Sequence, residues 1–444
     1  MNARLRSLRR VSCVFLLAIS CEAFAQNQQL LHADLDRLAQ EVEPQVIAWR
    51  RDFHQHPELS NREFRTGKII AEYLSQLGME VKTGIAHTGV VGILRGKAEV
   101  PVVALRADMD ALPVAEELDL PFASKVRTTY KGQEVGVMHA CGHDNHMAIL
   151  MGVANILSQV RGRLPGTVKF IFQPAEEGAP EGEEGGAALM IKEGVLKDPA
   201  PSAIFGLHVF PDPWRMISYK KGGMMASAER LQIVIRGRGT HGAMPWGGVD
   251  PIVVAAQVVM GLQTISSRQI RLTTAPAVVS IGSIHGGIRS NVIPDEVEMI
   301  GTIRALDPEM RKDIHERILR TVTKIAESAG AAAEVNIEVH GLPVTYNDPE
   351  LTTKMTPTLK RIAGTNGFDP DRSPVTVAED FSFYQEQIPG LFFLLGTAPQ
   401  DADPDTLEPN HSPRFYVDES ALIVGVRALS NLAVDYLAME SQAH

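Results

Sequence analysis

The chain has 444 residues, of which 44% are hydrophobic and 22% charged, and its formal net charge is −10. This length and composition exclude a largely disordered protein and predict sizeable hydrophobic cores in two domains. The acidic balance argues against nucleic acid as a partner, because binding to phosphate backbones depends on basic side chains.

The first 25 residues have the pattern of a secretory signal. Four arginines precede the apolar run 11–19, and Ala23-Phe24-Ala25 gives the small-x-small pattern that precedes cleavage. The run is too short to span a membrane, so we expect a periplasmic or secreted protein without a membrane span. The alternatives are an ordinary first helix, a lipid anchor at Cys21 and twin-arginine export at Arg9-Arg10. Cleavage would leave 39 basic and 52 acidic residues, a formal charge of −13.

One cysteine remains after cleavage, and it lies among histidines. Cys141 belongs to the segment His139-Ala140-Cys141-Gly142-His143-Asp144-Asn145-His146. Exported proteins usually pair their cysteines, but Cys141 has no partner left. A thiolate two residues from an imidazole offers soft and borderline ligands at a spacing that one metal ion can bridge. The segment therefore predicts a metal site whose remaining ligands come from elsewhere in the chain.

An inserted α+β domain is predicted over residues 221–336. Its expected elements are, in order, a strand (231–236), a helix (250–270), strands (277–284 and 296–306), a helix that stops before Gly330, and a final strand. This βαββαβ order predicts a ferredoxin-like sheet. Both helices start with Asp-Pro, at Asp250 and Asp307, where aspartate can cap free N–H groups and proline suits the first helical position.

The segments on either side, 26–220 and 337–444, predict a discontinuous α/β domain with a central, mostly parallel sheet and flanking helices. Apolar, β-branched runs alternate there with amphipathic helices. The runs are 100–105, 168–172 and 203–207, and the helices include 69–77 and 146–160. The second of these helices would place Cys141 and His143 in the loop before it.

Each of the three apolar runs ends in residues that can bind a metal. Asp108 and Asp110 follow the first run, Glu176-Glu177 the second and His208 the third. Taken alone, an Asp-x-Asp is usually a solvated turn and His208 a packed histidine. Sites in open α/β sheets form at the carboxyl ends of strands, so the convergence of three strand ends indicates one. Adjacent carboxylates allow one to bind metal while the other stays free as a general base.

Five motifs occur in order along the chain: His54-Gln55-His56-Pro57-Glu58-Leu59-Ser60, Arg106-Ala107-Asp108-Met109-Asp110-Ala111-Leu112-Pro113, His139-Ala140-Cys141-Gly142-His143-Asp144, Gln173-Pro174-Ala175-Glu176-Glu177-Gly178 and Asn410-His411-Ser412-Pro413. Together they resemble the aminoacylase and carboxypeptidase-G type metallopeptidase family, in particular its hippurate hydrolase and auxin-conjugate (IAA-amino acid) hydrolase branch. The resemblance implies a metal-dependent amidohydrolase that splits N-acyl or N-aroyl amino acids, with dipeptides as a further substrate class.

The resemblance also implies two divalent metal ions, Mn or Zn first and Co or Ni as alternatives. Glu176 matches the general base, and Asp110 matches an aspartate that orients a ligand. Asp108 stands where many relatives outside this branch have a metal-binding histidine. The implied ligands are Cys141, which bridges the ions, and His143, Glu177, His208 and His411.

A second group of implied residues lies in the inserted domain. His241, within 239–245, resembles a histidine that stabilises the oxyanion, often from a neighbouring subunit. Asn291 and Arg304 match positions that contact substrate, and an arginine fork suits a free carboxylate. The resemblance implies a homodimer or larger homo-oligomer. The remaining histidines of the motifs, His54, His56, His139 and His146, are assigned to structure or to support of the ligands.

Two other functions remain open from the residues alone. Cys141 could be a nucleophile activated by a nearby histidine, as in thiol hydrolases. That hypothesis leaves Glu176-Glu177, His208 and His411 unexplained. A non-catalytic periplasmic binding protein is the other alternative, and it would need ligands but no free base.

Overall fold

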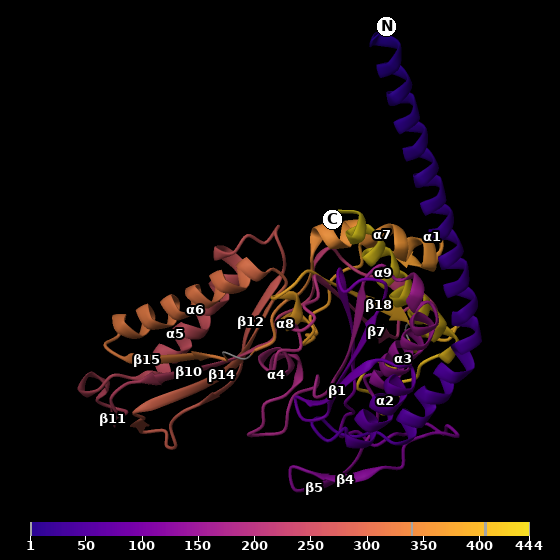
Figure 1. Ribbon diagram of the computed structural model, residues 1–444. Helices are drawn as coiled ribbons and strands as arrows, with labels where there is room; N and C mark the ends of the chain where they lie inside the picture. The colour runs from indigo at the N-terminus through magenta and orange to yellow at the C-terminus, as the bar shows by residue number, and fades with distance from the viewer. Residues whose placement is uncertain (1, 339–340, 404–405, 444) are drawn as a thin grey trace.

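The computed structural model describes residues 2–338, 341–403 and 406–443, with side chains described between residues 26 and 442 of these ranges. The chain forms two lobes, a large α/β body and a smaller α+β lobe that projects from it (Figure 1). The first part of the N-terminal helix extends away from the large lobe.

An eight-stranded mixed sheet forms the centre of the large lobe. Its strand order is β1 (Glu80–Ile85), β2 (Gly89–Arg95), β6 (Thr167–Gln173), β3 (Val102–Asp108), β7 (Ala203–Phe210), β18 (Gly390–Gly396), β8 (Ile217–Ser218) and β17 (Phe368–Asp369). The four central strands, β6, β3, β7 and β18, run parallel to one another. Every residue of β3, β6 and β18 is buried, as expected for parallel strands covered on both faces. The predicted mostly parallel α/β sheet is therefore confirmed.

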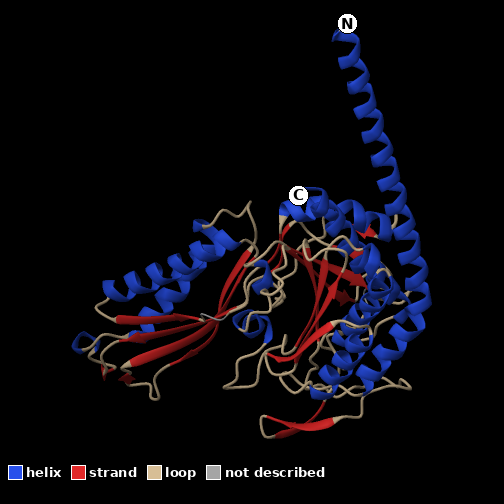
Figure 2. Cartoon of the chain, in the orientation of Figure 1, coloured by secondary structure: helices blue, strands red, loops and turns tan. Residues whose placement is uncertain are grey.

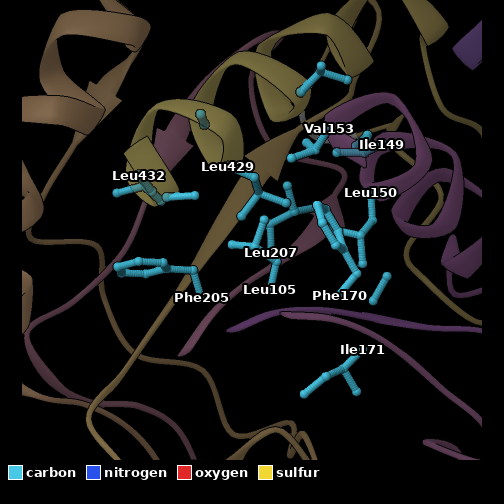
Figure 3. Close-up of a cluster of buried hydrophobic side chains, with 14 of the residues drawn as sticks. Leu105, Ile149, Leu150, Val153, Phe170, Ile171, Phe205, Leu207, Leu429 and Leu432 are labelled. Carbon is cyan, nitrogen blue, oxygen red and sulfur yellow. The ribbon is translucent and has the colours of Figure 1, made fainter. Parts of the chain in front are cut away.

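Helices from both ends of the chain cover this sheet. They are α1 (Asn2–Gln55), α2 (Phe64–Gln76), α3 (His143–Gln159), α4 (Gly186–Lys192), α7 (Pro349–Ala363), α8 (Ser382–Gln385) and α9 (Leu422–Ala443). α1, α3 and α9 contact one another, and α3 and α9 contact β3 and β7. The core between them is apolar and includes Ile149, Leu150, Val153, Leu105, Phe205, Leu207, Leu429 and Leu432 (Figure 3).

The C-terminal helix is apolar because it belongs to this core. Glu419–Gln442 is the one stretch of the described chain that is long and apolar enough to cross a membrane, yet 89% of its apolar window is buried. Three short antiparallel pairs complete the strands. They are β4 (Arg127–Tyr130) with β5 (Gln133–Gly136), β9 (Gly222–Met225) with β16 (Thr345–Asn347), and β11 (Thr240–His241) with β13 (Val292–Ile293).

The small lobe has the predicted βαββαβ order. Its elements are β10 (Glu229–Arg236), α5 (Pro251–Thr264), β12 (Ala277–His285), β14 (Glu296–Ala305), α6 (Pro308–Ser328) and β15 (Ala332–Ile337). The sheet is antiparallel throughout, in the order β12-β14-β10-β15. Both helices lie on one face of it (Figure 2). A separate hydrophobic core, with Leu231, Ile233, Val258 and Ile314 among its members, joins the two layers.

The expected helix caps are present in this lobe. The Asp250 carboxylate accepts hydrogen bonds from the N–H groups of Ile252 and Val253, and the Asp307 carboxylate accepts one from Met310. In each helix proline occupies the next position, where its missing N–H costs nothing. The exact limits 221–336 of the inserted domain stay a prediction.

One expected element boundary was wrong. The helix predicted to start at His146 starts at His143, so His143 is the first helical residue and does not lie in the preceding loop. Gly142 ends the loop with a φ of +93°, a backbone conformation that suits glycine. His143, Asp144 and Asn145 are polar but fully buried, so the apolar periodicity of α3 begins later than the helix itself.

Candidate active site

The strand ends converge as the sequence indicates. Asp108 ends β3, Asp110 follows it, and His208 lies near the end of β7, the neighbouring parallel strand. Glu176-Glu177 follow β6, on the other side of β3. The start of α3 adds Cys141 and His143. His411 comes from a distant loop that is fixed by a hydrogen bond from its N–H to the carbonyl of Ala140 (2.8 Å).

The five ligand candidates lie around the thiol of Cys141. Its Sγ is 3.3 Å from His208 Nε2 and 3.3 Å from His411 Nε2, and His411 Nε2 is 3.1 Å from Glu177 Oε1. Cys141 belongs to two sets of three residues whose ligand atoms lie within 4.8 Å of one another. One set adds His143 and His208, and the other adds Glu177 and His411. The geometry therefore fits two cations that share the thiolate.

Buried polar atoms of two ligand candidates also indicate a metal site. Nε2 of His143 is buried without a hydrogen-bond partner among the described residues, and the buried Oε1 of Glu177 has its 3.1 Å contact with His411 Nε2 but no further hydrogen bond there. Buried polar atoms of this kind are rare in folded proteins and call for an ion or water. Sulfur, imidazole nitrogen and carboxylate oxygen are together the donor set of zinc and related divalent metals.

Neighbouring groups orient two of the ligand imidazoles. His208 Nδ1 donates to the carbonyl of Val209 (2.7 Å), and His143 Nδ1 lies 3.3 Å from Asp110 Oδ1. In both rings this leaves Nε2 for a metal, the usual arrangement for ligand histidines. Burial is the main cause that lowers the pKa of His208 well below its ordinary value, which keeps this imidazole neutral.

In two other histidines of the motifs, both ring nitrogens already have polar partners within the protein. His146 Nδ1 contacts Asp108 Oδ1 (2.6 Å), while Nε2 accepts the N–H of Val209 (2.8 Å). His54 contacts Asp144 (2.8 Å) and Glu116 (3.2 Å). These contacts favour structural roles. Asp108 also bonds to Arg106 Nη1 (2.7 Å), so both its oxygens are occupied.

The surroundings of Cys141 do not suit a free thiolate nucleophile. Burial and the charges of Glu177 and Glu176 raise the pKa of the thiol well above its ordinary value. Reactive cysteines lie in electropositive, partly exposed places. Without a cation the thiol stays protonated, and a bound cation would reverse that preference.

Glu176 lies against a buried ionic cluster that the sequence did not reveal. Glu379 and Asp380 approach it, and the Asp380 N–H donates to Glu176 Oε1 (3.4 Å). Arg106 balances both acids, at 3.0 Å from Glu379 and 2.7 Å from Asp380. Burial first, and then the charges of Glu379 and Glu177, raise the pKa of Glu176 well above its ordinary value. The Glu379-Asp380 pair follows no predicted strand, so the strand-end signal could not find it.

A mainly apolar cavity of about 290 Å³ opens beside these groups. Glu176, Glu177, Cys141 and the two ligand candidates His208 and His411 line one side of it. The other walls are largely apolar and include Phe210, Met225, Leu342 and Val377. A substrate held here would place a polar bond at the ligand cluster and an apolar group against these walls.

The residues predicted in the small lobe lie elsewhere. His241, on β11 at the tip of the lobe, is exposed, and its neighbour Gly242 donates to the carbonyl of Asn291 (2.8 Å) (Figure 1). Arg304 is the last residue but one of β14, and its Nη1 donates to the carbonyl of Ile303 (2.9 Å). None of the three predicted residues lines the apolar cavity of this chain.

Comparison with known proteins agrees with this chemistry. Residues 104–435 match the sequence model of peptidase family M20/M25/M40, and the chain belongs to this family. The N-acetylcysteine deacetylase of Bacillus subtilis (strain 168) is 42% identical over 391 residues, which cover 88% of this chain and 96% of that protein. IAA-amino acid hydrolase ILR1-like 2 of Arabidopsis thaliana is 36% identical over 447 residues, which cover 98% and 95%.

A solved structure agrees as well. The YXEP protein of Bacillus subtilis, described as a dinuclear metal-binding peptidase, matches with a TM-score of 0.74 and 39% identity, over 90% of this chain and 99% of that one. The resemblance seen in the motifs is thus confirmed. The protein is a metal-binding hydrolase of the amidohydrolase and peptidase type.

Proposed function

We propose that the protein hydrolyses the amide bond of N-acyl or N-aroyl amino acids, releasing a carboxylic acid and a free amino acid. The observation that carries the proposal is Glu176, a carboxylate beside the ligand cluster that also borders an apolar cavity. A binding protein would need the ligands but not this extra base. The names of the deacetylase and the IAA-amino acid hydrolase, both of which act on acylated amino acids, support the substrate class.

Cys141, His143, Glu177, His208 and His411 would hold two divalent ions. When bound, such ions polarise an amide carbonyl and lower the pKa of a water. Glu176 takes the proton of the attacking water and delivers it to the leaving nitrogen. Mn or Zn are the ions we favour, with Co or Ni as alternatives, because the donors include sulfur, nitrogen and oxygen.

The cavity supports an acyl group of modest size. Its volume, about 290 Å³, is at the lower limit of small-molecule pockets, roughly 300–1,000 Å³. Its walls at Phe210, Met225 and Val377 are apolar and suit an aromatic ring or a short alkyl chain. We therefore propose that hippurate-like conjugates are better substrates than dipeptides with charged first residues.

A second copy of the chain would complete the site in this proposal. His241 is exposed at the tip of the small lobe, and large apolar side chains near it in sequence or space are exposed too, with Trp246 at 80% and Ile288 at 104% of full exposure. Exposed apolar patches mark interaction surfaces. We propose a homodimer, or a larger assembly built from it, in which His241 stabilises the oxyanion formed in the neighbouring subunit.

Export to the periplasm or the medium belongs to the same proposal. Its support is the arginine-rich, apolar start of the sequence and the extension of this part of α1 away from the large lobe (Figure 1).

A substrate panel tests the proposal. Protein starting at residue 26 is stripped of metal, resupplied with one divalent ion at a time, and assayed for amino acid release from acetyl, benzoyl and indoleacetyl amino acids. We expect metal-dependent release, fastest with an acyl group that fills the cavity. Activity that survives chelation but not alkylation would favour a Cys141 nucleophile. Tight binding without product for every ion and amide would favour a binding protein.

A further inference from the structure

A buried carboxylate lies behind the turn that carries Glu176 and Glu177. Glu63, the residue before α2, is fully buried. Its Oε1 accepts the N–H of Ala175 (3.0 Å) and its Oε2 accepts the hydroxyl of Thr88 (2.6 Å). Burial of a carboxylate is costly unless hydrogen bonds compensate for the lost water. Both oxygens of Glu63 have such a hydrogen bond, and one of the two donors belongs to the turn.

The turn adopts an unusual backbone conformation. Ala175 has a φ of +54°, in the left-handed region that residues with a Cβ rarely occupy. Such strain persists only where surrounding contacts hold it, and it gathers at functional sites. Here the strained residue immediately precedes Glu176 and Glu177.

Three consecutive N–H groups of the turn all donate to carboxylates. The N–H of Ala175 donates to Glu63 (3.0 Å). The next two, from Glu176 and Glu177, donate to the two oxygens of Asp110 (3.0 and 3.1 Å). Asp110 Oδ2 also accepts the Ser60 hydroxyl (2.7 Å), so Asp110 already has three donors and the Ala175 N–H is bonded to Glu63 instead.

We propose that Glu63 is a positioning residue for the reaction, whose hydrogen bond to Ala175 holds the left-handed turn that aims Glu176 at the substrate and Glu177 at the metals. This inference rests on the proposed roles of Glu176 and Glu177. Glu63 itself is placed at neither substrate nor metal. It is held in turn by Thr88, which directly precedes β2, and by the start of α2, where its carbonyl accepts the N–H of Gly67 (2.8 Å).

Two substitutions separate the hydrogen bond from the charge. Glu63→Ala leaves the N–H of Ala175 without an acceptor, so we expect kcat to fall on the order of 10- to 100-fold, with KM changed much less. Glu63→Gln keeps an acceptor for Ala175, and its amide can donate to Thr88. We expect it to stay within about threefold of the native kcat, because both hydrogen bonds are retained.

Glu58→Ala is the matched control. The Glu58 carboxylate accepts the N–H groups of Arg65 (3.1 Å) and Thr66 (2.8 Å) at the same end of α2, and neither bond reaches the turn. We expect this variant to lower the thermal midpoint while leaving kcat near the native value. A variant whose effect is only structural would behave like Glu58→Ala.

Readouts that need no substrate keep this test independent of the proposed function. Crystal structures should show Ala175 leaving the left-handed region in Glu63→Ala but not in Glu63→Gln. Titration of metal-free protein with Zn²⁺ should show affinity lowered about 10- to 100-fold in Glu63→Ala, as for other residues that support a ligand. If the native protein cleaves no amide, the proposed function fails, and these two measurements still decide the role of Glu63.

Two results would overturn the inference. One is a folded Glu63→Ala variant with native turn geometry, metal affinity and kcat. The other is a Glu63→Gln variant as impaired as Glu63→Ala, which would make the charge the essential property. If Glu63→Ala does not fold, it is made in an Ala175→Gly background, where glycine adopts the positive φ freely. In that background Glu63→Ala should lower kcat by less than tenfold, and a fall in kcat as large as in the native background would count against the inference.

Discussion

Glu176 and Glu177 are adjacent in sequence and have different surroundings. Glu177 Oε1 lies 3.1 Å from His411 Nε2 and belongs to the ligand set that contains Cys141. Glu176 instead borders Glu379 and Asp380, whose charges add to burial in raising its pKa well above the ordinary value. Glu177 is therefore placed to hold a cation, while Glu176, which also lines the apolar cavity, is placed to exchange a proton with a water there.

This difference predicts the behaviour of Glu176→Gln. Because the amide keeps the shape of the side chain but accepts no proton, kcat should fall by roughly 10²–10⁴-fold while substrate still binds. Two metal ions per chain should remain, measured by elemental analysis alongside the kinetics. Loss of one ion would instead make Glu176 a ligand, in keeping with its place beside His143 and Glu177. Glu181→Gln, an exposed residue of the same loop, serves as the control.

At the scale of elements, a buried charge cluster joins α1 to the start of α3. The Asp144 carboxylate lies 3.0 Å from Arg50 Nε and 2.8 Å from His54 Nδ1. Burial alone would raise the pKa of Asp144, but Arg50 and His54 outweigh it and lower the pKa below the ordinary value. The first turn of α3, which carries His143, is thereby fixed to the N-terminal helix.

Asp144→Asn should destabilise the protein at pH 7 by up to roughly 3–5 kcal/mol, because Arg50 loses a buried partner and is left with Glu419 (3.2 Å). A lowered pKa in the folded state gives stability that is complete above the unfolded pKa, about 3.9, and is lost as the pH falls below it. The gap in thermal midpoint between native and variant, measured without metal, should therefore stay constant from pH 7 to about pH 5 and narrow as the pH falls below about 4. An unchanged gap would mean that the aspartate charge is not what stabilises the pair.

Asp313→Asn is the control for that measurement. Asp313 also pairs with an arginine, Arg317 at 2.8 Å, one turn along α6, but this pair is partly exposed. Exposed pairs at this spacing contribute about 0.3–0.5 kcal/mol, so its removal should hardly move the midpoint.

Elements and site residues differ in how far the sequence predicted them. The strand-end rule located Glu176, Glu177 and His208 because parallel neighbours in one sheet end at the same edge. His411 lies in a loop, so only the motif resemblance could place it. Glu63 and Glu379 were missed because a buried carboxylate has no periodic pattern and its partners lie far away in the sequence.

At the scale of the whole molecule, the two lobes separate the proposed site residues. The ligand cluster lies in the large lobe, whereas β11, which carries His241, lies at the tip of the small lobe (Figure 1). β11 contacts the short turn Pro245–Gly247, which carries the exposed Trp246. Closed dimers place the same surface of both copies at one interface. A second copy could therefore bring a His241 to each ligand cluster, which a single chain in this conformation does not do.

Mixing two inactive variants tests this arrangement. Glu176→Ala lacks the base and His241→Ala lacks the oxyanion donor, so each alone should have little activity. If His241 acts across the interface, a mixed dimer contains one site with an intact Glu176 and the partner's intact histidine. Random exchange of subunits should then restore about one quarter of native activity per site, because half of the dimers are mixed and one of their two sites is complete. If His241 acts within its own chain, every site in the mixture lacks one group and no activity returns.

A control mixture, made after chemical cross-linking of each variant, should stay inactive in both cases. A monomer by light scattering would reject the arrangement outright.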